Sequence, residues 1–260
     1  MKKLMTAAGA LALGVCSFSA HAALFGYYLS FTGGSPATAI AASGNTSVAL
    51  TNLTAADLVG IDVLWILNGN NGAPDGNVTG NTAAISAFVN AGGVLSFHDR
   101  NVDQGLSAAT YVPGAGGVTF VSSFASDLDV QAVNTVTAGI NNTTLDGGNS
   151  SSHGYGVLST LPAGAVEVLS EGADTDRAVD FYYGFGAGDV YYSGIPLDFY
   201  LGGNGTNPPA DDFRNIYAVN EARFQGQLFA GNHIPEPGSL LLVAVAGLML
   251  LQGRRATLRR

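Results

Sequence analysis

The stretch Ile61-Asp62-Val63-Leu64-Trp65-Ile66-Leu67 (residues 61–67) decides the fold of this 260-residue chain. It is almost continuously apolar and shows no alternation of polar and apolar residues. Such a run predicts a strand that is covered on both faces, as strands of parallel sheets are. Residues 68–80 follow, and because they are rich in Asn, Gly, Pro and Asp they predict a loop.

A helix and a second strand come next. From Thr82 the apolar residues Ala84, Ile85, Phe88 and Val89 share one helical face, and Gly92-Gly93 ends the pattern. Residues 94–98 (VLSFH) then predict another buried strand. A strand, a helix and a strand in this order form a β-α-β unit, whose crossover makes the two strands parallel.

Weaker patterns extend the fold outward from this unit. The segment 54–58 resembles a helix start, and 213–228 predicts a closing amphipathic helix. Further strands are predicted at residues 24–31, 46–50, 117–124, 128–133, 166–170, 178–183 and 189–193. Alternating strands and helices around an apolar central strand predict an α/β fold, a three-layer sandwich with a mostly parallel sheet.

The first 22 residues predict an N-terminal signal peptide. Lys2 and Lys3 precede an apolar stretch at residues 5–18, and Ala20-His21-Ala22 has the small-x-small form of a cleavage site. Cleavage after Ala22 removes Cys16, the single cysteine, so the mature chain has no thiol, disulfide or thiolate metal site. A lipoprotein signal at residues 13–16 is the weaker alternative, because Val15 stands where a small residue is expected.

The charge of the exported part excludes one class of partner. The chain has a formal net charge of −9, and residues 23–231 contain no lysine. Their basic side chains are Arg100, Arg177, Arg214 and Arg223. So acidic a domain repels phosphate backbones, which excludes nucleic acid and favours solubility or divalent cations.

The C-terminal residues 232–260 predict a sorting signal. They contain Pro235-Glu236-Pro237, then an apolar run at 240–251, then Arg254, Arg255, Arg259 and Arg260. As a helix the run spans about 18 Å, which is short of the ~30 Å hydrocarbon core of a bilayer. The arginines would stay in the cytoplasm and leave the acidic domain outside.

This order of parts resembles the PEP-CTERM sorting signal. The resemblance implies a transmembrane sorting helix that anchors the protein transiently in the inner membrane. It also implies an exosortase-type enzyme that recognises Pro235-Glu236-Pro237 and removes the helix. The bearers of such signals are Gram-negative bacteria that make exopolysaccharide, so the expected destination after Sec export is the cell surface or the extracellular space.

Residues 23–231, the exported α/β domain, resemble the class I glutamine amidotransferase-like superfold, a flavodoxin-like arrangement. The similarity is carried by IDVLWIL (61–67), AFVNAGGVLSFHDR (87–100), GDVYYSGIPLDFYL (188–201) and FRNIYAVNEARFQ (213–225). It is greatest to exported and trehalose-utilisation-type members that are not amidotransferases. Catalytic members carry a cysteine where this chain has Ser96-Phe97-His98-Asp99. Without that nucleophile, thiol-based amide hydrolysis is not expected.

Three residues are the candidate catalytic or metal-binding groups. His98 and Asp99 follow the apolar strand, at the carboxyl end where open α/β sheets bind ligands. His153, in a polar loop, would complete a two-His, one-carboxylate site if it approached them. The structural alternative is that His98 and Asp99 hydrogen-bond the following loop and that Arg100 pairs with an acid.

No cofactor is predicted, but Ca²⁺ is possible. Asp127 with Asp129, and Asp174 with Asp176, have the D-x-D spacing that often supplies calcium ligands. The chain has no full EF-hand pattern, and solvated turns explain the same spacing. Several aromatic residues would stack on sugars if they pointed outward, or else pack in the core: Tyr182, Tyr183, Tyr191, Tyr192, Phe199 and Tyr200.

Three hypotheses for function follow. The leading one is an exported, non-catalytic binding or structural α/β domain at the cell surface or in the extracellular matrix, with polysaccharide as a partner. The second is an exported hydrolase or metal-dependent enzyme that acts on glycans through His98, Asp99 and His153. The third is a matrix component without a small ligand.

Overall fold

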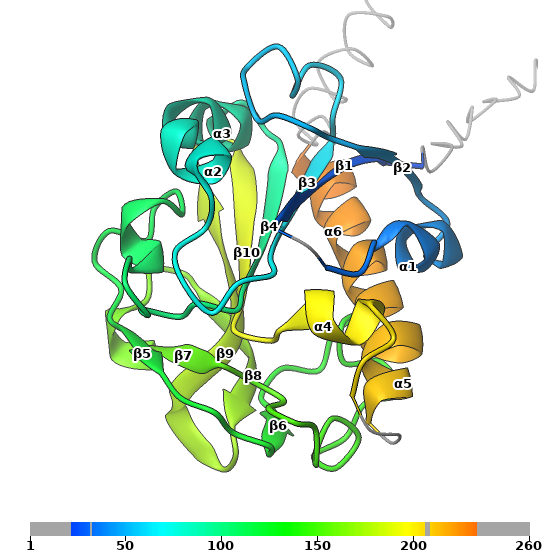
Figure 1. Cartoon of the computed structure of the whole chain (residues 1–260), viewed down its shortest axis with the longest axis vertical. Helices are drawn as coiled ribbons and strands as arrows, with labels where there is room; N and C mark the ends of the chain where they lie inside the picture. The colour runs from blue at the N-terminus through cyan, green and yellow to red at the C-terminus, as the bar shows by residue number, and fades with distance from the viewer. Residues whose placement is uncertain (1–21, 32, 206–208, 233–260) are drawn as a thin grey trace, which may run out of the picture.

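The computed structural model describes residues 22–31, 33–205 and 209–232 (Figure 1). The predicted signal peptide and sorting signal therefore lie outside the described residues, apart from Ala22 and Asn232 at their boundaries. Across the described ranges, none of the helices has both the length and the apolar character that a membrane span requires.

Within the described part of the chain, ten strands form one sheet in the order β2-β1-β3-β4-β10-β9-β7-β5, with β8 paired to β9 and β6. The strands are β1 (Leu24–Ser30), β2 (Thr46–Ala49), β3 (Val63–Asn68), β4 (Val94–Asp99), β5 (Phe120–Ser122), β6 (Leu128–Val130), β7 (Gly154–Val157), β8 (Val166–Glu171), β9 (Asp174–Phe185) and β10 (Gly188–Ser193).

The helical segments lie between and after these strands. The α-helices are α1 (Ala37–Ala42), α2 (Gly76–Gly80), α3 (Thr82–Asn90), α4 (Leu197–Leu201), α5 (Ala210–Asp212) and α6 (Ala218–Asn232). The 3₁₀ turns are η1 (Ala108–Thr110) and η2 (Leu158–Thr160), and η3 (Phe213–Tyr217) is a π-helix that runs directly into α6.

The predicted α/β class is confirmed, and the sheet is mixed. Strands β2, β1, β3, β4 and β10 are parallel neighbours, which includes the predicted β3-α3-β4 crossover. From β10 to β9 the pairing becomes antiparallel and stays so to β5. The change follows from a tight hairpin: Phe185 pairs with Gly188, and strands joined by so short a loop must be antiparallel.

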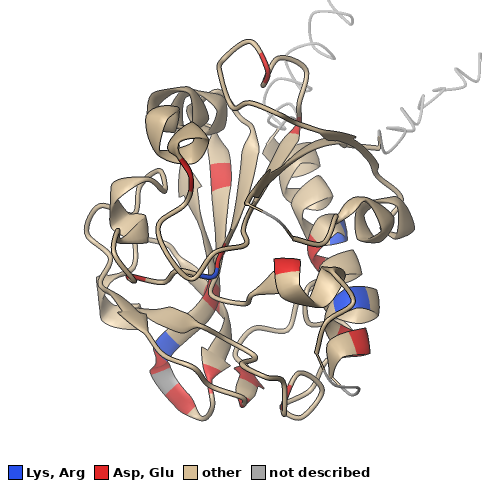
Figure 2. Cartoon of the chain, in the orientation of Figure 1, with Lys and Arg blue, Asp and Glu red and all other residues tan. Residues whose placement is uncertain are grey.

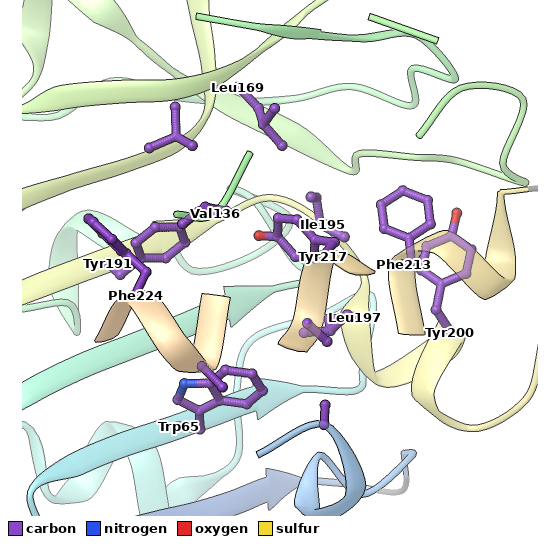
Figure 3. Close-up of a cluster of buried hydrophobic side chains, with 14 of the residues drawn as sticks. Trp65, Val136, Leu169, Tyr191, Ile195, Leu197, Tyr200, Phe213, Tyr217 and Phe224 are labelled. Carbon is purple, nitrogen blue, oxygen red and sulfur yellow. The ribbon is translucent and has the colours of Figure 1, made fainter. Parts of the chain in front are cut away.

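The sheet is covered on both faces where its strands are parallel. All six residues of β3 are buried, as the apolar run predicts. Because neighbours along a strand point to opposite faces, Trp65 packs on the α6 side and Leu64 and Ile66 on the α3 side. Figure 3 shows the α6 side, where Trp65, Tyr191, Phe213 and Tyr217 gather with Phe224.

Short elements account for the local departures from prediction. Residues 54–58 form a bend and turns rather than a helix start. The predicted loop 68–80 contains α2, because the Asp75 carboxylate accepts hydrogen bonds from the backbone of Asn77 and Val78 at its N-terminus. The predicted strands 117–124 and 128–133 are confined to β5 and β6.

Both ends of the described body lie at the edge where the parallel strands begin. The Ala23 backbone N–H donates to Asn45 Oδ1 at 3.0 Å, one residue before β1. At the other end of the chain, Asn232 Nδ2 donates to Asp189 Oδ2 at 2.9 Å, beside the start of β10.

Candidate functional site

The carboxyl ends of the parallel strands meet at one edge of the sheet. Ser30 of β1 pairs with Asn68 of β3, which pairs with Asp99 of β4, and Ser193 of β10 pairs with His98. Ligands of open α/β sheets bind outside this edge. The last strand residues themselves are buried, so a ligand would meet the loops that follow them.

His98 and Asp99 do not form a joint site. As consecutive residues of β4 they point to opposite faces of the sheet. The Nε2 of His98 lies 3.0 Å from Glu221 Oε1 under α6, whereas Asp99 Oδ2 accepts from Tyr111 Oη at 2.9 Å on the other side. Their exposed fractions are 1% and 0%, so both side chains are sealed from solvent.

The His98 side belongs to a buried network between β4 and α6. Glu221 Oε1 accepts from Ser96 Oγ at 2.7 Å, from His98 Nε2 at 3.0 Å, and from Gln225 Nε2 at 2.6 Å. Trp65 Nε1 in turn donates to Gln225 Oε1. Ser96 and His98 of β4 thus reach Glu221, and Trp65 of β3 reaches Gln225, so the network fastens α6 to the sheet at two helix residues.

A second buried acid lies across β10 from His98, since His98 pairs with Ser193 and Ser193 with Asp180. Asp180 Oδ2 accepts from Tyr217 Oη at 2.6 Å and from Tyr191 Oη at 3.1 Å. Loss of solvation by burial raises the pKa of Asp180 to about 7. Three atoms of this region have no hydrogen-bond partner in the structure: His98 Nδ1, Asp180 Oδ1 and Glu221 Oε2.

Asp99 organises the loop after β4. Its Oδ1 accepts from the Asn101 backbone at 2.9 Å and from Asn68 Nδ2 at 3.3 Å, and its Oδ2 also accepts from Tyr192 Oη at 3.1 Å. Burial raises the pKa of this carboxyl, although these hydrogen bonds oppose the shift. The predicted hydrogen bonding of Asp99 to the following loop is confirmed, whereas the same prediction for His98 is wrong, because its Nε2 contacts Glu221 of α6 instead.

His153 reaches the same edge from the loop before β7, but it meets the backbone of Arg100 rather than His98. Its Nδ1–H donates to the Arg100 carbonyl at 3.0 Å, because a carbonyl only accepts. Burial lowers the pKa of His153 to about 4, so the imidazole is neutral at pH 7 and its Nε2 is an acceptor. The Phe124 ring packs edge-on against it, with centroids 4.9 Å apart.

Arg100 is a partly exposed charged side chain that lines two hollows at this edge of the sheet. Its Nη1 donates to Asp198 Oδ2 at 3.1 Å, which confirms the predicted pairing with an acid, and its guanidinium lies 5.4 Å from the centre of the Phe199 ring. The side chain is 23% exposed. Two hollows share Arg100 and Phe199: one of about 300 Å³ beside Asp198 and Asn204, and one of about 70 Å³ beside Asn149 and His153. We call these two hollows the Arg100 site.

Glycine allows the chain to close around the larger hollow. A Cβ on Gly34 would lie 1.9 Å from the backbone nitrogen of Gly202, so no side chain fits there. The Gly34 N–H donates to the Asp198 carbonyl at 2.9 Å. This contact ties the loop after β1 to α4, and it holds Asp198 beside Arg100.

A hollow of about 340 Å³ lies at the opposite edge of the sheet. Leu58, Phe88 and Phe229 line it together with several alanines and glycines. Since its walls are mostly apolar and carry few convergent polar groups, the Arg100 site is the better candidate for specific recognition.

The aspartate pairs do not gather into a metal site. Over the ranges that the structure describes, no group of three or more His, Cys, Asp or Glu side chains could hold a metal ion. Asp174 pairs with Arg177 at 2.9 Å, and the Asp176 backbone N–H donates to Asp174 Oδ1. Near the other pair, burial raises the pKa of Asp146, and the charges of Asp127 and Asp129 add to the shift.

Most of the aromatic residues predicted as possible sugar contacts are core residues. Tyr183, Tyr191, Tyr192 and Tyr200 are buried, whereas Tyr182 and Phe199 are partly exposed. Sequence reasoning missed Glu221, Asp180 and Asp198. For Glu221 and Asp180 the sequence did contain a signal. Glu221 lies on the apolar face of a predicted helix and Asp180 inside an apolar strand, and an acid in such a place must find buried partners.

The comparisons with known proteins concern the fold. The sequence matches no protein-family model and no curated protein. A cytoplasmic protein of Salmonella typhimurium LT2 is similar in structure, with a TM-score of 0.54 at 11% identity over 79% of this chain and 99% of that one. A second cytoplasmic protein of Salmonella typhimurium has a TM-score of 0.53 at 10% identity, over 78% of this chain and 98% of that one. At such identities the likeness shows a shared fold alone.

Proposed function

We propose that this chain is an exported protein that is delivered to the cell surface or extracellular matrix of a Gram-negative bacterium. The support lies in the sequence: residues 1–22 have the form of a signal peptide, and 232–260 the form of a PEP-CTERM signal. On this proposal an exosortase-type enzyme recognises Pro235-Glu236-Pro237. It then releases the acidic domain from the inner membrane.

For the domain itself we propose glycan binding without catalysis, on an amidotransferase-like three-layer arrangement. One observation carries this proposal. On β4, which corresponds to the strand before the nucleophile in the resembling enzymes, Ser96 and His98 are both held by Glu221 and buried. Among the candidate residues named from the sequence, His153 lines a hollow, and that hollow belongs to the Arg100 site.

The binding proposal is tested with the secreted protein on a glycan array, followed by assays for release of reducing sugar from every bound glycan. Binding without turnover is the expected result. Turnover that His98→Ala or His153→Ala abolishes would instead establish the hydrolase hypothesis. No binding together with no turnover would favour a purely structural matrix role.

The sorting proposal makes a separate prediction. Replacing Glu236 with alanine is expected to keep the full chain in the membrane fraction, because the recognised triplet is lost while the apolar run and arginines remain. Intact-mass analysis of the secreted wild-type protein should give a product without the C-terminal arginines. Ser239→Ala, outside the triplet, is the matched control and should be processed normally. A secreted wild-type product that still ends at Arg260 contradicts the proposal.

A further inference from the structure

We propose that the Arg100 site binds an uncharged sugar through its hydroxyl groups, and that Arg100, His153 and Phe124 contact it. This inference rests on the proposed glycan-binding function and names the ligand class and the residues. Four observations carry it: the shape of the site, its mixture of donors and acceptors, its exposed aromatic rings, and its charge balance.

The shape suits a small ligand, because two hollows lie beside the same Arg100 and Phe199 pair. The hollow beside Asp198 and Asn204 measures about 300 Å³, near the lower end of the usual range for ligand pockets. The smaller one beside His153 measures about 70 Å³. Arg100 and Phe199 line both hollows. A ligand in either hollow therefore lies against the same guanidinium group and the same ring.

The polar groups offer both donors and acceptors. The Arg100 guanidinium only donates, and the 23% of the side chain that is exposed lines both hollows. The neutral His153 offers Nε2 as an acceptor, since its Nδ1–H is held by the Arg100 carbonyl. The side-chain amides of Asn149 and Asn204 do both. A hydroxyl group also donates and accepts, so a polyol can satisfy this mixed set, whereas a carboxylate or phosphate can use only the donors.

Aromatic rings stand where a sugar could lie against them. Phe124 packs on His153 and is nevertheless 60% exposed. Phe31, two residues before Gly33 of the larger hollow, is 49% exposed and has a φ of +70°. A bulky residue in this left-handed region is a conformational outlier, and such strain concentrates at binding sites. The exposed Phe124 ring beside His153 provides flat apolar area for the C–H faces of a sugar.

The charge balance selects an uncharged ligand over an acidic one. The positive charge of Arg100 is already matched by Asp198 at 3.1 Å, and the pKa of His153, about 4, leaves the imidazole neutral. The chain as a whole carries −9, and acidic residues far outnumber basic ones over the described structure (Figure 2). A polymer of uronic acids would therefore be repelled at long range without gaining an unpaired cation at the site.

Isothermal titration of the secreted, processed protein tests the inference. The probes are neutral gluco- and manno-oligosaccharides of four to six sugars, and oligomers of galacturonic or mannuronic acid of the same lengths. We expect at least one neutral series to bind, and the acidic series to bind at least about tenfold more weakly or not at all. Three single variants should each weaken binding of the neutral probe at least about tenfold. Arg100→Ala removes a charged hydrogen-bond donor, His153→Ala removes an acceptor, and Phe124→Ala removes a stacking ring.

Arg177→Ala is the matched control. Arg177 also pairs with acids, Asp174 and Glu171, and its guanidinium lies 5.3 Å from the centre of the Tyr155 ring, but it does not line the Arg100 site. The Arg177→Ala variant should bind the neutral probe with the same affinity as the wild type. The melting temperature of each variant is measured to check that the fold is intact.

The outcomes separate the inference from the function on which it rests. Binding of the acidic series alone overturns the ligand class and leaves glycan binding standing. Neutral binding that survives Arg100→Ala and Phe124→Ala in folded protein overturns the location. No binding of any probe, here and on the glycan array, overturns both, and the sorting proposal is then judged by intact mass alone.

Discussion

Replacing Glu221 with alanine is expected to lower the free energy of unfolding by about 3–5 kcal/mol, because three buried hydrogen-bond donors lose their common acceptor. The side chain is fully buried, and one of its oxygens accepts from Ser96, His98 and Gln225. Truncation leaves these three donors without an acceptor between the sheet and α6. A buried donor that has lost its partner costs roughly 1–3 kcal/mol.

Chemical denaturation of the processed protein measures this effect, provided that the dependence on denaturant concentration is the same for variant and wild type. Glu221→Gln keeps an oxygen acceptor in the same position, so a smaller loss is expected. Asp174→Ala is the exposed counterpart: Asp174 is 51% exposed and pairs with Arg177, and exposed pairs contribute about 0–1 kcal/mol. A loss below about 1 kcal/mol for Glu221→Ala would show that the network does not fasten α6.

Replacing Asp180 with asparagine is expected to stabilise the protein at pH 8 by about 2–4 kcal/mol and to change little at pH 4. Burial raises the pKa of Asp180 from an ordinary value of 3.8 to about 7; the nearby Glu221 charge adds to the shift, while Ser193, Tyr217 and His98 oppose it. The folded state therefore favours the protonated acid. The stability that the protonated Asp180 contributes is fully present below pH 4 and is lost as the pH rises through 7.

The expected stabilisation at pH 8 is calculated from the pKa shift. Each unit by which a pKa differs between the folded and unfolded states corresponds to about 1.4 kcal/mol. Asparagine has the shape of the protonated acid, stays neutral at every pH, and keeps an oxygen for the hydroxyl groups of Tyr217 and Tyr191. The observable is the difference in unfolding free energy between variant and wild type at pH 4, 6 and 8. Other groups, such as the half-buried Glu167 with a pKa of about 7, titrate in both proteins, so their contributions cancel. A difference that stays constant with pH would contradict the raised pKa of Asp180.

The sequence predicts the parallel half of the fold better than the antiparallel half. Residues 61–100 are informative because each element is a contiguous pattern with its own stop signal, and β3, α3 and β4 all lie where the patterns predict them. Apart from the hairpins β8–β9 and β9–β10, the antiparallel half depends on which distant segments pair: β5 with β7, β6 with β8, and β7 with β9. Strands β5 and β6 are only three residues long, and β8 pairs with β9 through register shifts, which no local pattern encodes.

The candidate site shows the same division. That Arg100 pairs with an acid was predictable, because a lone cation near a sheet edge needs a counter-charge, but the identity of Asp198 was not. The period of a strand could have separated His98 from Asp99, since consecutive strand residues face opposite ways. The convergence of Glu221, Asp180 and His98 depends on how η3 and α6 lie across the sheet. Glu221 and His98 are 123 residues apart in the sequence, so their contact is a property of tertiary packing.

The placement of the two ends of the domain has a practical consequence. Ala23 and Asn232 lie where β1 and β10 begin, whereas the Arg100 site lies beyond the ends of β1, β4 and β10. An affinity tag, a biosensor chip or a fluorescent fusion joined at either end is therefore held on the side away from the pocket. Immobilisation through either terminus should leave the pocket facing the solution, so the orientation in which the domain is displayed is set by its topology.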